Sequence, residues 1–232
     1  LKDMIRSSRE PVAAVLRAGA QSGGRGRQNK TYFSPAGGVY FSAAYPLTGE
    51  EKNAPYLTLL AGLAVCRALE SMRPAEYRIK WPNDIYLNNK KLCGILTELV
   101  AVGGRNTAVV GVGINTDVKK EDIPPDLSGI MTSLAAEGLK YPDADALTRK
   151  IVFLLDHYVY DRRALYGDTA AFSAEINARA YLTGKTVSVD TGNETVSGVV
   201  KRISPAGLLV IGTAEGEREV FSGTVFVASR RI

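Results

Sequence analysis

The segment from Lys80 to Glu98 constrains the fold more than any other part of this chain. Two apolar runs, Ile85–Leu87 and Leu92–Leu96, lie on either side of the pair Asn88-Asn89. Asparagine tolerates the left-handed backbone of a tight turn, and short apolar runs beside such a turn are typical of antiparallel strands. The segment therefore predicts a β-hairpin.

Polar residues at the strand ends of this hairpin point to chemistry. Lys80, Asn83, Asp84 and Lys91 gather beside Trp81, the only tryptophan in the sequence. Cations and an amide suit a polyanionic substrate, and a carboxylate suits a general base or a metal contact. On the local pattern alone, an ordinary hairpin with solvated charges is the alternative.

Positive charge is concentrated near the N-terminus. Residues 1–34 contain seven Lys or Arg and two carboxylates, so they account for the whole net charge of +5. Within them, residues 21–30 combine glycines with Arg25, Arg27 and Lys30 and lack apolar anchors. Such a loop can hold an anion through backbone N–H groups and guanidinium groups. A flexible Arg/Gly segment that binds nucleic acid is the alternative.

The composition is that of a soluble globular protein, with 45% hydrophobic and 23% charged residues among 232. No apolar run approaches the roughly 18 residues needed to cross a bilayer, and the N-terminal residues do not resemble a signal peptide. Cys66 and Cys93 lie in apolar contexts, which predicts reduced core thiols of a cytoplasmic protein. A single histidine, His157, is predicted on a helix surface and argues against a Cys/His zinc site.

Apolar periodicity predicts the order of the elements. Helices are predicted over residues 1–9, 55–72 and 143–166, and strands over 12–16, 39–45, 77–80 and 107–115, of which the first and the last should be buried. The composition changes after Tyr181. From Gly184 onward, about five short strands alternate with tight turns, which is typical of a small β-barrel.

Three motifs follow one another along the chain. They are Gly24-Arg25-Gly26-Arg27 leading to Phe33-Ser34-Pro35, then Lys80-Trp81-Pro82-Asn83-Asp84 with Lys91-Leu92-Cys93-Gly94-Ile95-Leu96, and then Gly111-Val112-Gly113-Ile114-Asn115. Together they resemble the biotin protein ligases, also called biotin–[acetyl-CoA-carboxylase] ligases. Each motif alone is of moderate specificity, whereas the three in this order and spacing are specific, and the resemblance covers nearly the whole chain.

The resemblance implies an α+β protein with two domains. Residues 1–182 are expected to form the catalytic domain, with a central mixed β-sheet flanked by helices as in class II synthetases. Residues 183–232 are expected to form a small SH3-like β-barrel.

The resemblance also implies a two-step enzymatic activity in a bacterial cytoplasm. Biotin and MgATP first give biotinyl-5′-AMP and diphosphate. The biotinyl group is then transferred to a specific lysine of the biotin carboxyl carrier protein of acetyl-CoA carboxylase or a related carboxylase. ATP, Mg²⁺ and biotin are the implied ligands, with no dedicated metal site in the protein. A homodimer is compatible with exposed sheet edges, whereas nucleic acid and membrane are not expected partners.

The resemblance implies functional roles for the residues that match the family's motifs. The implied catalytic residues are Lys91, Arg27 and Asp84, and Asp84 is the candidate base or orienting group for the acceptor lysine. An aspartate that only holds the adjacent turn is the competing interpretation of Asp84. The implied biotin contacts are Gln21, Gly24, Arg25, Arg27, Lys91, Gly94, Gly111, Val112 and Gly113. The implied ATP and adenylate contacts are Arg25, Lys30, Tyr32, Asn83, Lys91 and Asn115.

Two of these segments carry more specific expectations. Tyr32 stands where a tryptophan often covers the adenine, and tyrosine can stack in the same way with a smaller ring. Residues 21–33 are expected to be mobile without ligand and to close over the adenylate as a lid, because an acyl-adenylate hydrolyses readily in water.

The sequence departs from the family pattern in two places. The family usually carries a Ser-Thr-Asn motif before its first helix, and this chain begins at Leu1, inside a predicted helix, without that motif. We therefore expect a longer natural protein, and we do not expect the chain as given to act as an operator-binding repressor. Near the C-terminus, Thr224 stands where the family usually has a glutamate, which weakens any role for that position.

Two other functions stay open at this point. A lipoate or octanoate ligase or transferase shares the catalytic fold, and the choice depends on pocket walls that the sequence does not reveal. A nucleic-acid-binding module would use the basic N-terminal region, although it would not need the lysine-bearing hairpin or the Gly-x-Gly strand.

Overall fold

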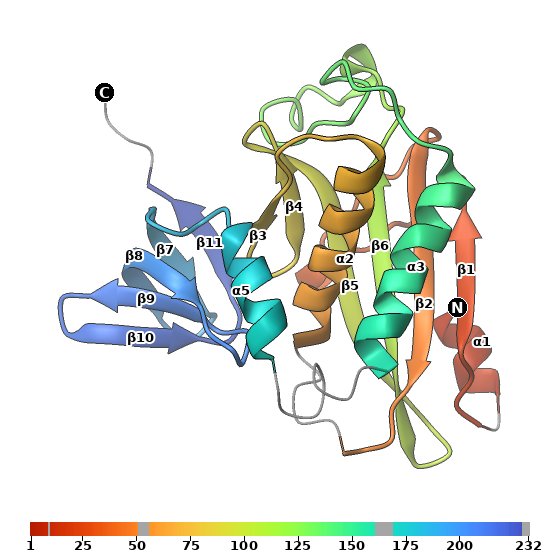
Figure 1. Cartoon of the computed structure of the whole chain (residues 1–232), viewed down its shortest axis with the longest axis horizontal. Coiled ribbons are helices and arrows are strands. Elements are labelled where there is room, and N and C mark those ends of the chain that lie inside the picture. The colour runs from red at the N-terminus through yellow and green to blue at the C-terminus, as the bar shows by residue number, and fades with distance from the viewer. Residues whose placement is uncertain (9, 51–55, 161–168, 229–232) are drawn as a thin grey trace.

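The computed structural model describes residues 1–8, 10–50, 56–160 and 169–228, which form two antiparallel sheets with helices around the larger one (Figure 1). The larger sheet has the strand order β1-β2-β6-β5-β4-β3. Its strands are β1 (Ala14–Ala18), β2 (Gly38–Pro46), β3 (Arg78–Lys80), β4 (Asp84–Leu87), β5 (Lys90–Val102) and β6 (Arg105–Asn115).

The predicted hairpin is confirmed. β4 and β5 pair in antiparallel fashion across Asn88 and Asn89, whose φ angles are 49° and 64°. Both residues adopt the left-handed backbone that a two-residue hairpin turn requires, and asparagine reaches this conformation at little cost. The returning strand is longer than its apolar pattern indicated, because β5 continues to Val102 and pairs with β6 along its length.

The α+β class is confirmed, and one detail of the prediction is wrong. Every pairing between named strands of the described residues is antiparallel, so the central sheet is not mixed. Parallel pairing occurs only in isolated bridges, from Ile79 to Ala180 and from Lys91 to Met131.

The two faces of this sheet are covered differently (Figure 1). Helices α2 (Leu57–Met72) and α3 (Ala144–Tyr160) pack on one face. Alternate residues of the strands point toward them, so Val110, Val112 and Ile114 of β6 belong to the main hydrophobic core. The predicted helix 55–72 is confirmed from Leu57 onward, and residues 161–166 of the third predicted helix lie outside the described residues.

The opposite face is only partly covered. Helix α1 (Lys2–Ser7) buries Ile5 there in a small cluster with Ala44, Val100, Val102 and Val109. Beyond that cluster the strands carry glycines and charged residues, which leaves room for the cavity described below.

The first predicted strand forms but is not buried. β1 is the edge strand of the sheet, and Val15 and Leu16 keep 49% and 46% of their surface exposed. An apolar run predicts a strand from its own residues, but its burial depends on what packs beyond the edge, which is a matter of tertiary structure.

The C-terminal strands form the second sheet, in the order β10-β9-β8-β7-β11. They are β7 (Thr186–Asp190), β8 (Thr195–Ile203), β9 (Leu209–Thr213), β10 (Gly216–Val220) and β11 (Thr224–Val227), which confirms the predicted run of short strands. The predicted domain boundary at residues 182 and 183 stays a prediction. A short 3-10 helix, η3 (Lys120–Asp122), follows β6.

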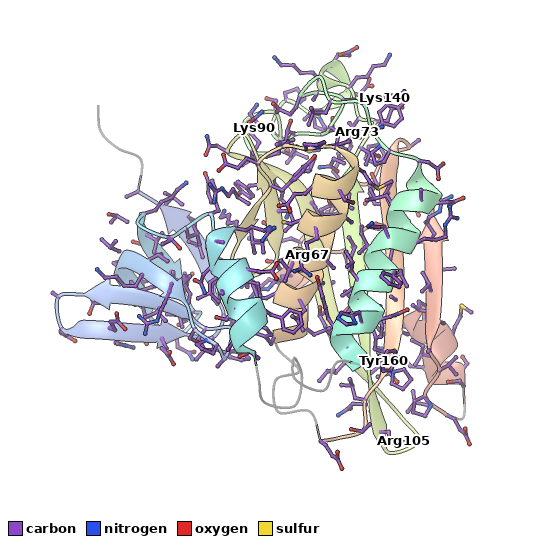
Figure 2. All side chains as sticks on the ribbon, in the orientation of Figure 1. Arg67, Arg73, Lys90, Arg105, Lys140 and Tyr160 are labelled. Carbon is purple, nitrogen blue, oxygen red and sulfur yellow. The ribbon has the colours of Figure 1, made fainter. Side chains whose placement is uncertain are left out.

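Helix α5 (Ala170–Ala178) connects the two parts and was not predicted from the sequence. Arg67 of α2, labelled in Figure 2, donates through Nε to Glu175 of α5 at 2.9 Å. Arg179 donates to Glu70 at 2.8 Å. The apolar periodicity of this segment is weak, so the sequence did not predict the helix. Charged pairs at the interface with α2 hold it in place.

Cys66 and Cys93 are free and fully buried, as predicted. Burial raises the pKa of both thiols, so they stay protonated and unreactive in the folded chain. His157 lies exposed on α3, which confirms its predicted place. None of the helices in the described residues has the length and apolar character needed to span a membrane.

Candidate active site

Strand register builds a flat floor on the open face of the larger sheet. Side chains two residues apart share a face, so Gly111 and Gly113 of β6 lie on this face together. Across the pairing, Gly113 lies opposite Gly94 of β5 and opposite Tyr40 of β2, and Gly111 lies opposite Ser42. Three glycines without side chains keep this part of the floor low.

A cavity of about 560 Å³ lies above this floor. Its size suits one ligand of a few hundred daltons or two smaller ones bound side by side. Its walls come from the loop over residues 21–32, from the hairpin at residues 80–84 and from the floor strands, with a contribution from the C-terminal sheet. The predicted site residues that line it are Gln21, Arg25, Arg27, Lys30, Tyr32, Asn83, Asp84, Lys91, Gly94, Gly111, Val112 and Gly113.

The glycine-rich loop is folded back on itself at the mouth of the cavity. Arg25 and Thr31 form a β-bridge, and Gly26 N–H donates to the Lys30 carbonyl at 2.7 Å. Between them lies the short 3-10 helix η1 (Arg27–Asn29). At the base, Tyr32 N–H donates to the Gly24 carbonyl at 2.9 Å. The cationic side chains of the loop therefore extend from a turn that backbone hydrogen bonds close. The predicted mobility of residues 21–33 stays a prediction.

Tyr32 explains two of the floor glycines. A Cβ atom at Gly113 would lie 2.5 Å from Cε1 of Tyr32, and one at Gly94 would lie 2.8 Å from Cε2, so the ring rests on this glycine pair. Its hydroxyl donates to the Gly113 carbonyl at 2.7 Å. Burial raises the pKa of the Tyr32 phenol well above its usual value, so the group stays a neutral donor. The ring therefore forms a fixed aromatic wall of the cavity.

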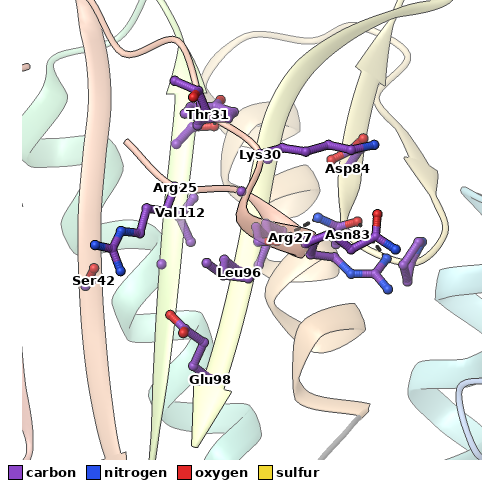
Figure 3. Close-up of a pocket in the computed structure, with 18 of the residues that line it drawn as sticks. Arg25, Arg27, Lys30, Thr31, Ser42, Asn83, Asp84, Leu96, Glu98 and Val112 are labelled. Atoms are coloured by element: carbon purple, nitrogen blue, oxygen red, sulfur yellow. Dashed lines mark hydrogen bonds between the residues drawn. The ribbon is translucent and has the colours of Figure 1, made fainter. Parts of the chain in front are cut away.

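Charged side chains divide between two ends of the cavity (Figure 3). At one end the Lys91 Nζ lies 2.7 Å from Asp84 Oδ1 and 5.6 Å from the centre of the Tyr32 ring. Lys30 points toward Asp84 at the same end (Figure 3). Arg25 points the other way, toward Ser42 (Figure 3).

Arg27 joins the loop to the hairpin. Its Nη1 donates to Asn83 Oδ1 at 3.5 Å, and Asn83 in turn donates to the Ile95 carbonyl at 2.9 Å. Burial lowers the pKa of the Arg27 guanidinium, and the Asp84 carboxylate opposes that shift. Lys91, Arg27 and Asp84 therefore share one end of the cavity, so an anionic group there meets at least two cations.

Two predicted residues do not line the cavity. Gly24 is buried at the base of the loop, where a Cβ atom would lie 2.5 Å from both Ser34 Oγ and the Tyr32 carbonyl oxygen. Asn115 is also buried, and its Nδ2 donates to the Thr132 carbonyl at 3.0 Å. The Asn115 Oδ1 has no hydrogen-bond partner among the described residues.

The structure adds residues that the sequence did not single out. Ser42 and Glu98 line the cavity, and Lys2 of α1 donates to both carboxylate oxygens of Glu98 at 2.8 Å. Thr224, which the sequence did single out but with a weakened role, also lines the cavity at the start of β11, and its hydroxyl donates to Gln28 Oε1 at 3.3 Å. A polar residue inside an apolar strand is the one signal that could have identified Ser42.

A second cavity of about 360 Å³ adjoins the first beneath Arg27 and Asn83. It lies between the start of α2 and the C-terminal sheet, and Trp81 and Gly207 are among its walls. The two cavities share the hairpin residues 81–83, so the hairpin forms the partition between them.

Both parts of the chain are similar to known proteins. Residues 1–115 match the model of the biotin/lipoate A/B protein ligase family, and residues 182–227 match that of the biotin protein ligase C-terminal domain. The bifunctional ligase/repressor BirA of Bacillus spizizenii is 30% identical over 224 residues, which cover 95% of this chain and 68% of the relative.

Two further similarities extend over most of both partners. The biotin–[acetyl-CoA-carboxylase] ligase of Mycobacterium tuberculosis is 30% identical over 217 residues, or 91% of this chain and 77% of the relative. The solved structure of biotin protein ligase from Aquifex aeolicus in complex with biotin and ATP superposes with a TM-score of 0.83 at 28% identity. That superposition covers 98% of this chain and 94% of the other.

Proposed function

Because the chain belongs to the biotin protein ligase family, we propose that it activates biotin with ATP and transfers the biotinyl group to a lysine of a carrier protein. In the first step the biotin carboxylate attacks the α-phosphorus of ATP and diphosphate leaves. In the second step the lysine amine attacks the acyl carbon and AMP leaves. One observation carries this proposal. Two cations lie together at one end of a cavity whose floor is apolar and rich in glycine.

Activation requires two anions to meet. Carboxylate and phosphate repel one another, so the site must supply positive charge where the new bond forms. Lys91 and Arg27 stand at this end of the cavity, and each is held by a neighbour, Asp84 and Asn83 respectively. We propose that these two cations hold the carboxylate and the α-phosphate, with Asn83 as a further phosphate contact. Lys30 points into the same end and supplies a third cation (Figure 3).

The neutral part of biotin needs a close-fitting apolar surface with a few hydrogen bonds. The floor at residues 111–113, where Gly111 and Gly113 face the cavity and Val112 contributes its backbone, offers such a surface, and Gln21 and Arg25 stand above it. We assign biotin to this floor. The ring of Tyr32 is the wall against which the adenine stacks. Asn115 is buried away from the cavity, so no adenylate contact is assigned to it.

Mg²⁺ enters this proposal as part of MgATP. No cluster of three or more His, Cys, Asp or Glu side chains in the described residues could hold a metal by itself. Mg²⁺ commonly binds through one or two carboxylates together with substrate phosphates and water. Asp84 is the carboxylate at the phosphate end, and bound magnesium would neutralise phosphate charge there.

In the transfer step the acceptor lysine must lose a proton before it attacks. Asp84 is partly exposed and lies 2.7 Å from Lys91. We propose that Asp84 orients the acceptor amine and receives its proton once the adenylate has formed. Residues 21–33 then serve as a lid that keeps water from the acyl-adenylate until the carrier docks.

The proposed partner is the biotin carboxyl carrier protein of a carboxylase. We further propose a homodimer formed through β1, because this edge strand exposes Val15 and Leu16 and Val12 is exposed just before it. An edge strand with exposed apolar side chains can pair with a second copy. Sedimentation velocity with and without biotin and ATP tests the dimer, and a monomer at all concentrations contradicts it.

Isotope exchange between diphosphate and ATP tests the proposed activity. We expect exchange that depends on biotin and on Mg²⁺, followed by biotinylation of an added carrier domain. Lipoate or octanoate in place of biotin is the matched alternative for this fold. Exchange stimulated by lipoate and not by biotin contradicts the proposal, as does salt-sensitive nucleic-acid binding without any exchange.

A further inference from the structure

A hydrogen bond connects the C-terminal part of the molecule to the hairpin that carries the site. Trp81 Nε1 donates to the Gly207 carbonyl at 2.9 Å, and Trp81 is only 2% exposed. Trp81 immediately precedes Pro82, Asn83 and Asp84, so its orientation sets the direction in which this segment enters the cavity wall. The contact therefore spans the two parts of the molecule at a point next to the proposed chemistry.

The turn that provides this carbonyl is rigid. Gly207 lies between β8 and β9 with a φ of 83°, and its N–H donates to the Ser204 carbonyl at 2.8 Å. A Cβ atom at Gly207 would lie 2.9 Å from Cδ2 of Tyr56 and 3.2 Å from Cδ1 of Leu59. The turn is thus seated in a notch at the start of α2 that accepts only glycine.

Helix α5 and the residue before it fix the same turn from another side. The side-chain amide of Asn177 donates to the Ile203 carbonyl at 2.8 Å and accepts from the Ile203 N–H at 2.8 Å. Thr169 Oγ1 donates to the Pro205 carbonyl at 2.7 Å. With these bonds, the acceptor for Trp81 has a defined position relative to the larger sheet.

On the other side of Trp81, the hairpin links the position of Trp81 to residues that line the cavity. Asn83 bridges Arg27 and the Ile95 carbonyl, and Asp84 pairs with Lys91. A shift of Trp81 moves both contacts, because only one and two residues separate it from Asn83 and Asp84. Small displacements of groups that hold reacting anions cost much of the rate while leaving gross binding intact.

We propose that the turn between β8 and β9 is a positioning element of the active site and acts through the bond from Trp81 to the Gly207 carbonyl. Trp81 is then a positioning residue that acts on the reaction by orienting Asn83 and Asp84. The inference rests on the proposed function for its kinetic readout. It gives the C-terminal sheet a role in the adenylation step that does not depend on the carrier protein.

The substitution Trp81→Phe tests this proposal, since it keeps an aromatic ring and removes the N–H donor. We expect kcat for biotin-dependent ATP–diphosphate exchange to fall about tenfold, with KM for biotin and ATP within twofold of wild type. Thr148→Val is the matched control, because it removes a buried hydroxyl hydrogen bond, to the Ala144 carbonyl within α3, that has no part in holding the turn. We expect wild-type kcat for this control after the melting temperatures of both variants have been recorded.

Gly207→Ala provides a second test with Trp81 in place. The added methyl group meets Tyr56, so the turn should shift, kcat should fall and KM should stay unchanged. Because Trp81 is the only tryptophan, its fluorescence emission should shift in Gly207→Ala and not in Thr148→Val.

The outcomes separate the two proposals. A wild-type enzyme without biotin-dependent exchange contradicts the proposed function. An active wild type whose kcat stays within twofold in Trp81→Phe, or falls equally in Thr148→Val, contradicts the positioning role alone. If Trp81→Phe does not fold, Gly207→Ala decides by the same kcat and KM criteria together with its emission spectrum. If Gly207→Ala also does not fold, Thr169→Val, which removes a hydrogen bond that holds the same turn, decides by the same kcat and KM criteria, and a wild-type kcat there overturns the proposal.

Discussion

The two faces of the six-stranded sheet use the same strands for different purposes. On the face under α2 and α3, every second residue of β6 is a buried aliphatic such as Val110 or Val112. On the other face, the intervening positions are Gly111 and Gly113, and side chains such as Glu98 of β5 point into a cavity. Because side chains alternate along a strand, one sequence can build a dense core and a ligand floor within the same few residues.

This difference separates stability from activity at neighbouring positions. A residue on the helix-covered face contributes through packing, so its loss should lower the free energy of unfolding and leave chemistry intact. A residue on the open face has few packing neighbours and a specific partner, so its loss should do the reverse. Substitutions on each face test whether stability and activity separate in this way.

The largest expected effect is the loss of activity in Lys91→Ala on the open face. This cation is the one closest to Asp84, and removal of one group that stabilises transition-state charge typically costs about 10²–10³ in kcat. Biotin-dependent ATP–diphosphate exchange measures the loss. Lys90→Ala is the matched control, because Lys90 belongs to the same strand and its Nζ donates to the Ser128 carbonyl at the surface.

Thermal unfolding accompanies this measurement. The melting temperature of Lys91→Ala should stay close to that of wild type, since an ion pair that is partly exposed contributes little to stability. Full activity of Lys91→Ala would remove this residue from the mechanism.

The next effect should be the loss of stability in Leu60→Ala on the helix-covered face. Leu60 of α2 is fully buried in the main core, and truncation of such a side chain costs about 2–5 kcal/mol of unfolding free energy. Urea unfolding followed by circular dichroism measures it. Leu99→Ala should change stability by less than about 0.5 kcal/mol, because Leu99 is 56% exposed.

The contrast also predicts the kinetics of Leu60→Ala. At a temperature where the variant is folded, its kcat should match that of wild type. A marked loss of kcat in the folded variant would show that the two faces are coupled and that the core helps to shape the site.

The sequence predicted the parts of this arrangement that local chemistry determines. The turn at Asn88-Asn89 and the helix over residues 57–72 follow from residue preferences within a few positions. The three motifs likewise brought Arg27, Asn83 and Lys91 to one cavity, because family resemblance carries tertiary information that a single pattern does not.

Other features depend on pairings between distant segments. Ser42 joins the floor because β2 pairs with β6 in a register that places it opposite Gly111. Asn115 shares a face with Gly113, but the segment that carries Thr132 covers it, so its amide is bonded away from the cavity. Neither the register nor the covering segment could be derived from local patterns.

The smallest effect is expected from a methyl group added to the floor, and it depends on which glycine receives it. In Gly113→Ala the new Cβ meets the Tyr32 ring at 2.5 Å, whereas in Gly111→Ala the nearest atom is the Leu96 carbonyl oxygen at 3.4 Å. Gly113→Ala should therefore displace the ring and cost about 1–3 kcal/mol of stability, as overpacking usually does. Gly111→Ala should leave stability unchanged. It should raise KM for biotin, because its methyl group occupies space on the floor assigned to biotin.

A double-mutant cycle tests whether Tyr32 is the cause of this difference. In a Tyr32→Ala background the ring is absent, so Gly113→Ala should no longer destabilise the fold, and the two substitutions should be strongly non-additive. Additive effects would mean that Gly113 is required for another reason, such as close approach of a ligand or strand geometry. Non-additive effects would show that at this position the open face is built, like the helix-covered face, around a side chain of the protein itself.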